Sequence, residues 1–248
     1  MVRRRIGKIG KVVVVLSGKG GVGKSVLSAS LALLMRKAGY RVGLLDADIY
    51  GPSAALLLGT RKRPREGKGG LVPPTVAGVK VMSVDLIALG VPLPLMGHEA
   101  SEVILEMLAL TDWGVLDFLV VDMPPSTADI LMAVTSLGTD RVVALVVTTP
   151  DGLASSVTHR TLELVRSENI PVLGLLENNQ SRPTEHRLGR GARNLADEFG
   201  IAMLGSIPYD GEILRFVDSK SPGLLSKTAF ARAVGSALLG RLPSLLPQ

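Results

Sequence analysis

The chain of 248 residues carries a formal net charge of +6, contains no cysteine, and is 46% hydrophobic but only 3% aromatic. The absence of cysteine excludes disulfides, thiolate metal sites and cysteine nucleophiles, and the apolar fraction excludes a disordered chain. We expect one α/β domain over residues 1–248, with a core of Val, Leu, Ile and Ala.

The N-terminus, Met1-Val2-Arg3-Arg4-Arg5, resembles the basic end of a signal peptide. However, the apolar stretch from Val12 to Leu16 is shorter than the roughly 7–15 residues of a signal core. No apolar run reaches the roughly 18 residues that a membrane-spanning helix needs. We therefore expect a cytoplasmic protein without a membrane partner, and a basic N-terminal arm over residues 1–10.

The first predicted elements are a strand, a glycine-rich loop, a helix and a second strand, over 11–16, 17–24, 25–38 and 41–45. The helix follows from apolar residues at helical spacing, and Gly39 is placed to end it. Residues 59–78 then hold five glycines and three prolines among basic residues. This composition predicts a mobile basic loop or hairpin and not a domain boundary.

Strands and helices alternate along the rest of the chain. Strands are expected over 79–84, 116–121, 141–147, 172–176 and 202–206, and helices over 99–110, 153–167, 188–199 and 229–239. Such alternation implies right-handed crossovers, and so a mostly parallel β-sheet flanked by helices on both faces. In such sheets, ligands bind beyond the carboxyl ends of the strands.

Two basic clusters stand out, at Arg3 to Arg5 and at Arg61-Lys62-Arg63 with Arg65 and Lys68. Either cluster has the charge to attract nucleic acid or an acidic membrane surface. No recognition motif accompanies them, and no stacking aromatic residue lies nearby. We expect a solvated terminus and a solvated loop, without a nucleic acid partner.

Residues 18–25 (GKGGVGKS) match the phosphate-loop pattern, with a predicted strand before and a helix after. The glycines let successive N–H groups turn towards phosphate oxygens, and the helix adds its positive end. Lys24 should reach the β- and γ-phosphates of ATP, and Ser25 should ligate Mg²⁺. The expected nucleotide-binding residues of this segment are Gly18, Lys19, Gly20, Gly21, Val22, Gly23, Lys24, Ser25 and Val26.

Three aspartates lie at the ends of predicted strands: Asp46 and Asp48 follow the second strand, and Asp122 follows residues 116–121. An aspartate in this place is often a helix cap. In the company of a phosphate loop, Asp122 suits a carboxylate that holds magnesium through water.

Residues 17–25 (SGKGGVGKS) resemble the deviant phosphate loop of MinD, ParA and the nitrogenase iron protein. Residues 46–53 (DADIYGPS) and 111–125 (TDWGVLDFLVVDMPP) narrow the resemblance to the Mrp-type ATPases, also called ApbC, which are iron–sulfur cluster carriers. It runs from about residue 8 to the C-terminus, and MinD and ParA proteins lack the Gly51-Pro52-Ser53 ending. It implies a MinD-like P-loop NTPase fold and a slow, homodimeric ATPase with iron–sulfur assembly or recipient proteins as partners.

The resemblance also implies roles for single residues. Lys19 matches a signature lysine that reaches the partner subunit's nucleotide, and Asp48 matches the carboxylate that positions the attacking water. With Lys24, these form the expected catalytic set. Asp46 and Asp122 match the carboxylates that, together with Ser25, surround the metal. Asn178 matches an asparagine that hydrogen-bonds the adenine.

The chain departs from the family where the iron–sulfur ligands would lie. The family carries a Cys-x-x-Cys pair shortly after the Asn178 position, whereas residues 180–187 (QSRPTEHR) are shorter and hold no thiolate. Cluster ligation of the family's kind is therefore not available, and we expect no iron–sulfur ligands. Of His98, His159 and His186, only His186 lies in this loop, and a lone loop histidine is expected to be solvated.

The family's Pro-Pro-Gly-Thr-Gly-Asp switch reads PPSTAD at 124–129, and the loss of two glycines is expected to stiffen it. Two other functions remain open. A MinD- or ParA-like positioning ATPase would act on a membrane or DNA, although prolines 243 and 247 break a terminal amphipathic helix. An ATP-gated interaction protein would bind nucleotide with negligible turnover.

Overall fold

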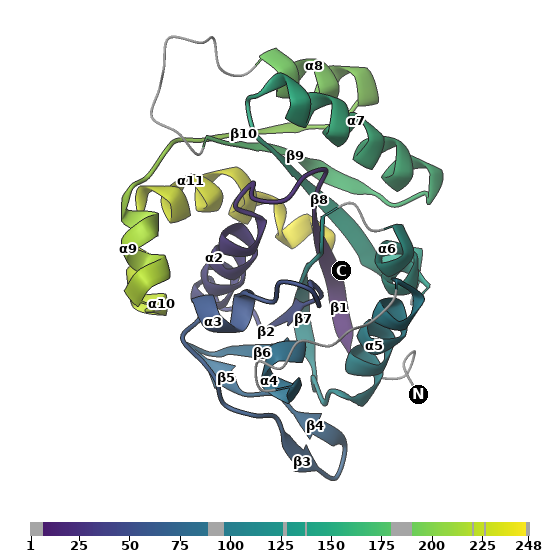
Figure 1. Ribbon diagram of the computed structural model, residues 1–248, viewed down its shortest axis with the longest axis vertical. Coiled ribbons are helices and arrows are strands. Elements are labelled where there is room, and N and C mark those ends of the chain that lie inside the picture. Colours follow the sequence, from purple (N-terminus) through teal and green to yellow (C-terminus); the bar gives the residue numbers. More distant parts are fainter. Residues whose placement is uncertain are drawn as a thin grey trace.

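The structure, a computed structural model, describes residues 7–88, 97–125, 128–136, 138–179, 190–219, 221–225 and 227–246. Ten strands and a series of helices follow each other along the chain in the alternating order expected of an α/β protein (Figure 1). They are β1 Ile9–Ser17, α2 Lys24–Lys37, β2 Val42–Asp46, α3 Ala54–Leu57, β3 Arg65–Gly67, β4 Gly70–Val72, β5 Thr75–Val76, β6 Val79–Ser83, α4 Val84–Ala88, α5 Gly97–Leu110, β7 Leu116–Asp122, α6 Ala128–Thr135, β8 Val142–Thr148, α7 Gly152–Ser167, β9 Val172–Asn178, α8 Arg190–Phe199, β10 Met203–Ile207, α9 Glu212–Ser219, α10 Pro222–Leu225 and α11 Ala229–Leu238.

Eight of the strands form one sheet in the order β10-β9-β8-β1-β7-β2-β6-β5. Every neighbouring pair in it is parallel except the short edge pair β5–β6. The expected mostly parallel sheet is therefore confirmed. In β1, Val13 and Val15 join one core cluster while Val12 and Val14 join the other, because successive side chains of a strand point to opposite faces.

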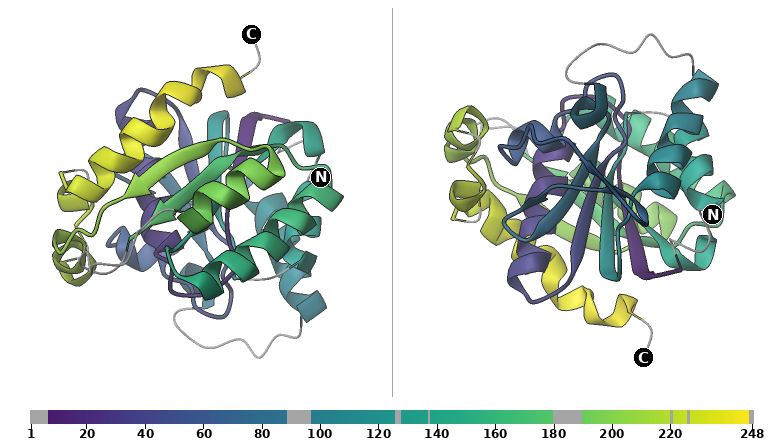
Figure 2. Two further views of the ribbon diagram at one scale, coloured as in Figure 1. Left: turned by 90° about the horizontal axis from the view of Figure 1, so that it is seen from above. Right: turned by 90° about the horizontal axis from the view of Figure 1, so that it is seen from below.

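Helices cover both faces of the sheet (Figure 2). One face packs against α2, α3 and α11, and the other against α5, α6, α7 and α8. Strands buried on both faces explain why β1, β7 and β8 read as nearly continuous apolar runs. Among the described helices, none is both long and apolar enough to cross a membrane.

The sequence did not predict several short elements, among them α3, α4 and α10, which are too short for a clear helical period. It also missed α6 and α9, which have eight residues each. Helix α5 begins at Gly97, two residues before the expected start at residue 99, so His98 lies inside the helix. Within residues 59–78, the hairpin alternative is correct, because β3 and β4 pair there.

Candidate functional site

The phosphate loop joins β1 to α2 at the carboxyl edge of the sheet. Gly21 and Gly23 have φ angles of 76° and 83°, in the left-handed region that favours glycine. Gly18 lies against α7, where an added Cβ would meet the carbonyl carbon of Val157 at 2.6 Å. The loop is therefore shaped both by its own turns and by contact with α7.

Lys24, the first residue of α2, is only 7% exposed and points towards the end of β7. Its Nζ donates to Oδ1 of the fully buried Asp122 at 3.1 Å. Ser28, one turn further along α2, donates its Oγ–H to the same oxygen at 3.0 Å. Oδ2 of Asp122 is buried and has no hydrogen-bond partner among the described residues, so this oxygen can still accept a hydrogen bond.

Asp46 ends β2 directly beside Asp122, its register partner on β7. Its carboxylate accepts N–H bonds from Ser53 and Ala54, both at 2.8 Å, and from Asp48 at 3.2 Å. Burial and, to a smaller extent, the neighbouring Asp122 carboxylate together raise the pKa of Asp46 to about 8, although the three N–H bonds oppose the rise. Two buried carboxylates that repel each other favour a cation between them.

The carboxylates of Asp46 and Asp122 have the chemistry to hold magnesium through water, and Ser25 lies half-buried at the start of α2. The part of these residues in binding the metal stays a prediction. Within the described residues, no group of three or more His, Asp or Glu side chains could hold a metal ion. Magnesium at this site would therefore depend on the Ser25 hydroxyl, water and phosphate oxygens for its other ligands.

Asp48 lies in the loop after β2, where its Oδ1 accepts the N–H of Gly51 at 3.0 Å. It is half-buried, whereas Asp46 and Asp122 are fully buried. Its role in positioning water stays a prediction.

Asn178 ends β9 and is 5% exposed. Its Nδ2 donates to the carbonyl of Val22 at 2.8 Å, so the asparagine fastens β9 to the phosphate loop. The amide oxygen is then the group suited to an adenine amino group. The adenine contact itself stays a prediction.

Lys19 reaches the start of α7 in the same subunit. Its Nζ lies 2.7 Å from Oδ2 of Asp151, which also accepts from Thr149 Oγ1 at 2.6 Å. Oδ1 of Asp151 caps α7 through the N–H of Ala154 at 2.8 Å. Partial burial would raise the pKa of Asp151, but hydrogen bonds from Lys19, Thr149 and Ala154 outweigh it and lower the pKa to about 2.

Sequence reasoning missed two residues of this site. The sequence gives only a weak signal that Ser28 belongs to the site. Residues four apart share a helix face, and Ser28 is four residues after Lys24. Asp151 carries the signal of a helix cap before α7, but its pairing with a lysine 132 residues away has no trace in the sequence.

Part of the predicted site lies outside the described residues. This holds for Ser126 and Thr127 of the altered switch, and for the whole 180–187 stretch with His186. Of the other histidines, His159 lies within α7 as expected, and His98 is in the first turn of α5.

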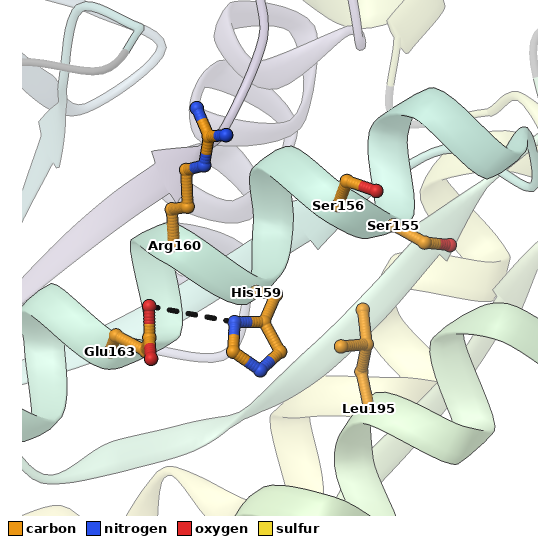
Figure 3. Close-up of a pocket in the computed structure, with 6 residues that line it drawn as sticks. All are labelled: Ser155, Ser156, His159, Arg160, Glu163 and Leu195. Atoms are coloured by element: carbon orange, nitrogen blue, oxygen red, sulfur yellow. Dashed lines mark ion pairs between the residues drawn. The ribbon is translucent and has the colours of Figure 1, made fainter.

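A shallow hollow of about 450 Å³ lies on the outer side of α7, next to α8 (Figure 3). His159 beside it links the two helices, with Nε2 3.0 Å from Glu198 and Nδ1 3.5 Å from Glu163. None of the predicted site residues lines this hollow. Its lining is Ser155, Ser156, His159, Arg160, Glu163 and Leu195.

Comparison with known proteins adds to this geometry. Residues 8–237 match the family model described as ParA, the NUBPL iron-transfer P-loop NTPase. An iron-sulfur cluster carrier protein of Pseudomonas fragi is 39% identical over 231 residues, which is 88% of this chain and 79% of that protein. The mouse iron-sulfur cluster transfer protein NUBPL is 35% identical over 250 residues, which is 94% of this chain and 78% of that protein.

The chain spans 64% of a second carrier protein, from Aquifex aeolicus, which is 34% identical over 235 residues. Among solved structures, a nucleotide-binding protein of Archaeoglobus fulgidus in complex with ADP is 31% identical, with a TM-score of 0.74 over 88% of this chain and 90% of that one. A septum site-determining protein MinD from Pyrococcus horikoshii, with Mg-ADP, is 19% identical with a TM-score of 0.68 over 92% and 93% of the two chains. The MinD likeness shows the fold alone.

Proposed function

We propose that this chain binds ATP with magnesium and hydrolyses it slowly as a homodimer in the cytoplasm. The proposal starts from its family, because the chain belongs to the NUBPL iron-transfer P-loop NTPases. Its role would be in the assembly or transfer of iron–sulfur clusters. The observation that carries the proposal is the buried group at the end of the phosphate loop. There Lys24 and Ser28 hold one oxygen of Asp122, while its other oxygen has no partner among the described residues.

In this proposal, Lys24 leaves Asp122 partly or wholly and neutralises the β- and γ-phosphates when ATP binds. Asp122 and Asp46 would hold water molecules around magnesium, and Ser25 would bind the ion directly. Magnesium supplies charge neutralisation at the transferring phosphate. The half-buried Asp48 would orient the attacking water, because its carboxylate accepts hydrogen bonds and lies outside the Asp46–Asp122 pair.

Lys19 is proposed to act on the nucleotide of a second subunit. In a single subunit it is paired with Asp151 at the surface, with both side chains more than a third exposed. An exposed ion pair is weak, about 0–1 kcal/mol, and can exchange for a phosphate partner at small cost. A positive charge brought from a second subunit would then complete the site, as an arginine finger does in other NTPases.

In this proposal, the iron–sulfur cluster is cargo that passes between other proteins, and it is not a resident cofactor of this chain. The sequence offers no cysteine thiolate to hold it, and clusters are held chiefly by thiolates. The proposed role is therefore an ATP-driven change of dimer geometry that helps a cysteine-bearing protein to load or release its cluster. The iron–sulfur part of the proposal rests on the family alone.

The test is a subunit-mixing experiment with Lys19→Ala and Asp48→Asn proteins carrying different tags. Each variant alone should bind ATP but show almost no steady-state hydrolysis. In a mixed dimer, the Lys19→Ala subunit keeps its own Asp48 and receives Lys19 from its partner. One site in each mixed dimer is then complete, and random mixing should restore about a quarter of the parent activity.

The control is Lys19→Ala mixed with the double variant Lys19→Ala/Asp48→Asn, which leaves no complete site and should stay inactive. If tagged mixed dimers form and the first mixture is also inactive, Lys19 acts within its own subunit and the shared-site proposal fails. Parent protein that hydrolyses no bound ATP in a single-turnover assay would instead be an ATP-gated interaction protein.

A further inference from the structure

The segment 59–78, which includes the β3–β4 hairpin, carries most of the net charge of the molecule. Residues 59–78 hold five basic residues and one acidic residue, a net charge of +4 in a chain whose net charge is +6. All five basic side chains are exposed, and within the described residues none of them forms an ion pair. They are Arg61, Lys62, Arg63, Arg65 and Lys68.

The hairpin is a fixed part of the fold. Strand β4 forms a parallel bridge from Leu71 to Thr111, and the N–H of Asp112 donates to the Leu71 carbonyl at 2.7 Å. Leu71 also packs on the core cluster beneath α5. Arg65 and Lys68 are thus carried on an anchored hairpin, and Arg61, Lys62 and Arg63 lie in the segment that leads into it.

The hairpin lies at the edge of the sheet opposite the nucleotide site. It docks on Thr111 and Asp112, which precede the amino end of β7. The phosphate loop follows the carboxyl end of β1, which runs parallel to β7. Figure 1 shows β3 and β4 projecting from one end of the molecule, away from α7 and α8. A partner bound at the hairpin would leave the ATPase site open.

Arg61, Arg63 and Arg65 occupy alternate positions of a segment that leads into β3. Arg63 precedes a proline, which favours an extended backbone there. On an extended chain, alternate side chains share one side at a spacing of about 6.6–6.8 Å. The phosphates of a DNA duplex recur in each strand about every 3.4 Å along the helix axis, so a row of arginines on one side of this segment faces a dense row of negative charges.

We propose that the β3–β4 hairpin binds the phosphate backbone of a nucleic acid duplex without reading its sequence. Arginine pairs well with phosphate through two parallel N–H bonds, and a two-stranded ribbon fits the major groove of DNA. Residues 59–78 contain no aromatic side chain on which the bases of a single strand could stack. The inference does not depend on the function proposed above.

The experiment measures fluorescence anisotropy of a labelled 20-base-pair DNA duplex of mixed sequence, titrated with the whole protein at 50 and 200 mM NaCl. Three to five phosphate contacts predict an affinity about 40-fold to 500-fold weaker at the higher salt. The variant Arg61→Gln/Arg63→Gln/Arg65→Gln keeps two basic residues in the segment. It should bind more than about tenfold more weakly at 50 mM and lose only about tenfold between the two salts.

A matched variant, Lys37→Gln/Arg193→Gln/Arg241→Gln, removes the same charge from three exposed positions elsewhere. It should keep the affinity of the parent within about threefold, and melting curves should show that both variants fold. If both variants lost the same affinity for the duplex, binding would depend only on the net charge of the protein, and the proposal would be overturned. So would no binding by the parent at 50 mM, or full displacement of the duplex by a poly-glutamate peptide at equal charge, which would indicate an acidic protein partner.

Discussion

Lys24 and Asp122 form an ion pair that is almost fully shielded from water, with exposures of 7% and 0%. A buried charge whose partner is removed costs far more than an exposed one, because water cannot replace the lost contact. The Lys24 ammonium thus offsets the cost of burying the charged Asp122 carboxylate while no nucleotide is bound. It also holds the lysine close to the position where the resemblance expects the phosphates.

Lys24→Ala should therefore have two effects. Loss of a charge-assisted contact to phosphate should weaken ATP binding by about tenfold to a hundredfold, measured by calorimetry. The unpaired Asp122 should lower the free energy of unfolding of the nucleotide-free protein by about 3–5 kcal/mol in urea. Lys37→Ala, at the exposed far end of the same helix, is the matched control and should change neither. Unchanged ATP affinity in a folded Lys24→Ala protein would remove Lys24 from the binding site.

At the level of elements, α7 holds the phosphate loop at two places. The Gly18 backbone lies against Val157 and Thr158, and Lys19 pairs with the capping residue Asp151. Loop and helix are far apart in sequence, and only the parallel pairing of β1 with β8 brings them together. The shape of the loop thus depends on tertiary packing as well as on its glycines.

Gly18→Ala tests the first contact. The new Cβ would lie 2.6–2.9 Å from backbone atoms of α7, and such overpacking costs about 1–3 kcal/mol. Gly20→Ala is the control within the same loop, because its Cβ meets nothing nearer than Pro125 Cγ at 3.9 Å. It should change the free energy of unfolding by less than about 0.5 kcal/mol. Equal urea midpoints for the two variants would mean that α7 does not constrain the loop.

Asp151→Ala tests the second contact through its pH dependence. Loss of the cap should cost about 0.5–2 kcal/mol at pH 7. Because the pKa of Asp151 falls from 3.8 to about 2 on folding, its charge stabilises the protein above about pH 4, and this part is lost as the pH falls through about 2.

The difference between parent and Asp151→Ala in thermal unfolding should therefore shrink between pH 4 and pH 2. Thr228→Ala is the control, since Thr228 caps α11 by accepting the Ala231 N–H at 3.0 Å and carries no charge. Its cost should stay constant over this range. A constant cost for Asp151→Ala as well would show that only the cap, and not the charge, contributes.

For the whole molecule, the sequence predicted the sheet and the phosphate loop because both depend on local patterns. Runs such as residues 116–121 are apolar throughout, and the loop is a contiguous motif between strand and helix. The Lys19–Asp151 pair, the Lys24–Asp122 pair and the Asn178–Val22 contact were not predicted, because each joins residues 98 to 156 positions apart. Only the strand order brings these ends to one edge of the sheet.

The missing cysteines lead to a prediction about the whole molecule. We expect that this protein alone does not assemble a stable [4Fe–4S] cluster on anaerobic incubation with iron and sulfide. Iron in such clusters takes thiolate ligands, and the chain offers none. A neutral methionine thioether cannot balance the charge of the cluster, and Met35, Met82, Met107 and Met123 are buried in the core.

Histidine cannot fill the place of the thiolates either. Only His186 lies in the 180–187 stretch, so a dimer would supply two ligands there, fewer than the four that such clusters use. The measurement is iron and sulfide content with visible absorbance after desalting, and the Pseudomonas fragi carrier protein serves as the positive control. Near-stoichiometric iron and sulfide in this protein would contradict the prediction and would require ligands from outside the chain, such as a small thiol. ATP-dependent dimerisation, followed by light scattering in the same samples, should persist without a cluster, because the residues expected to bind nucleotide are separate from the missing ligands.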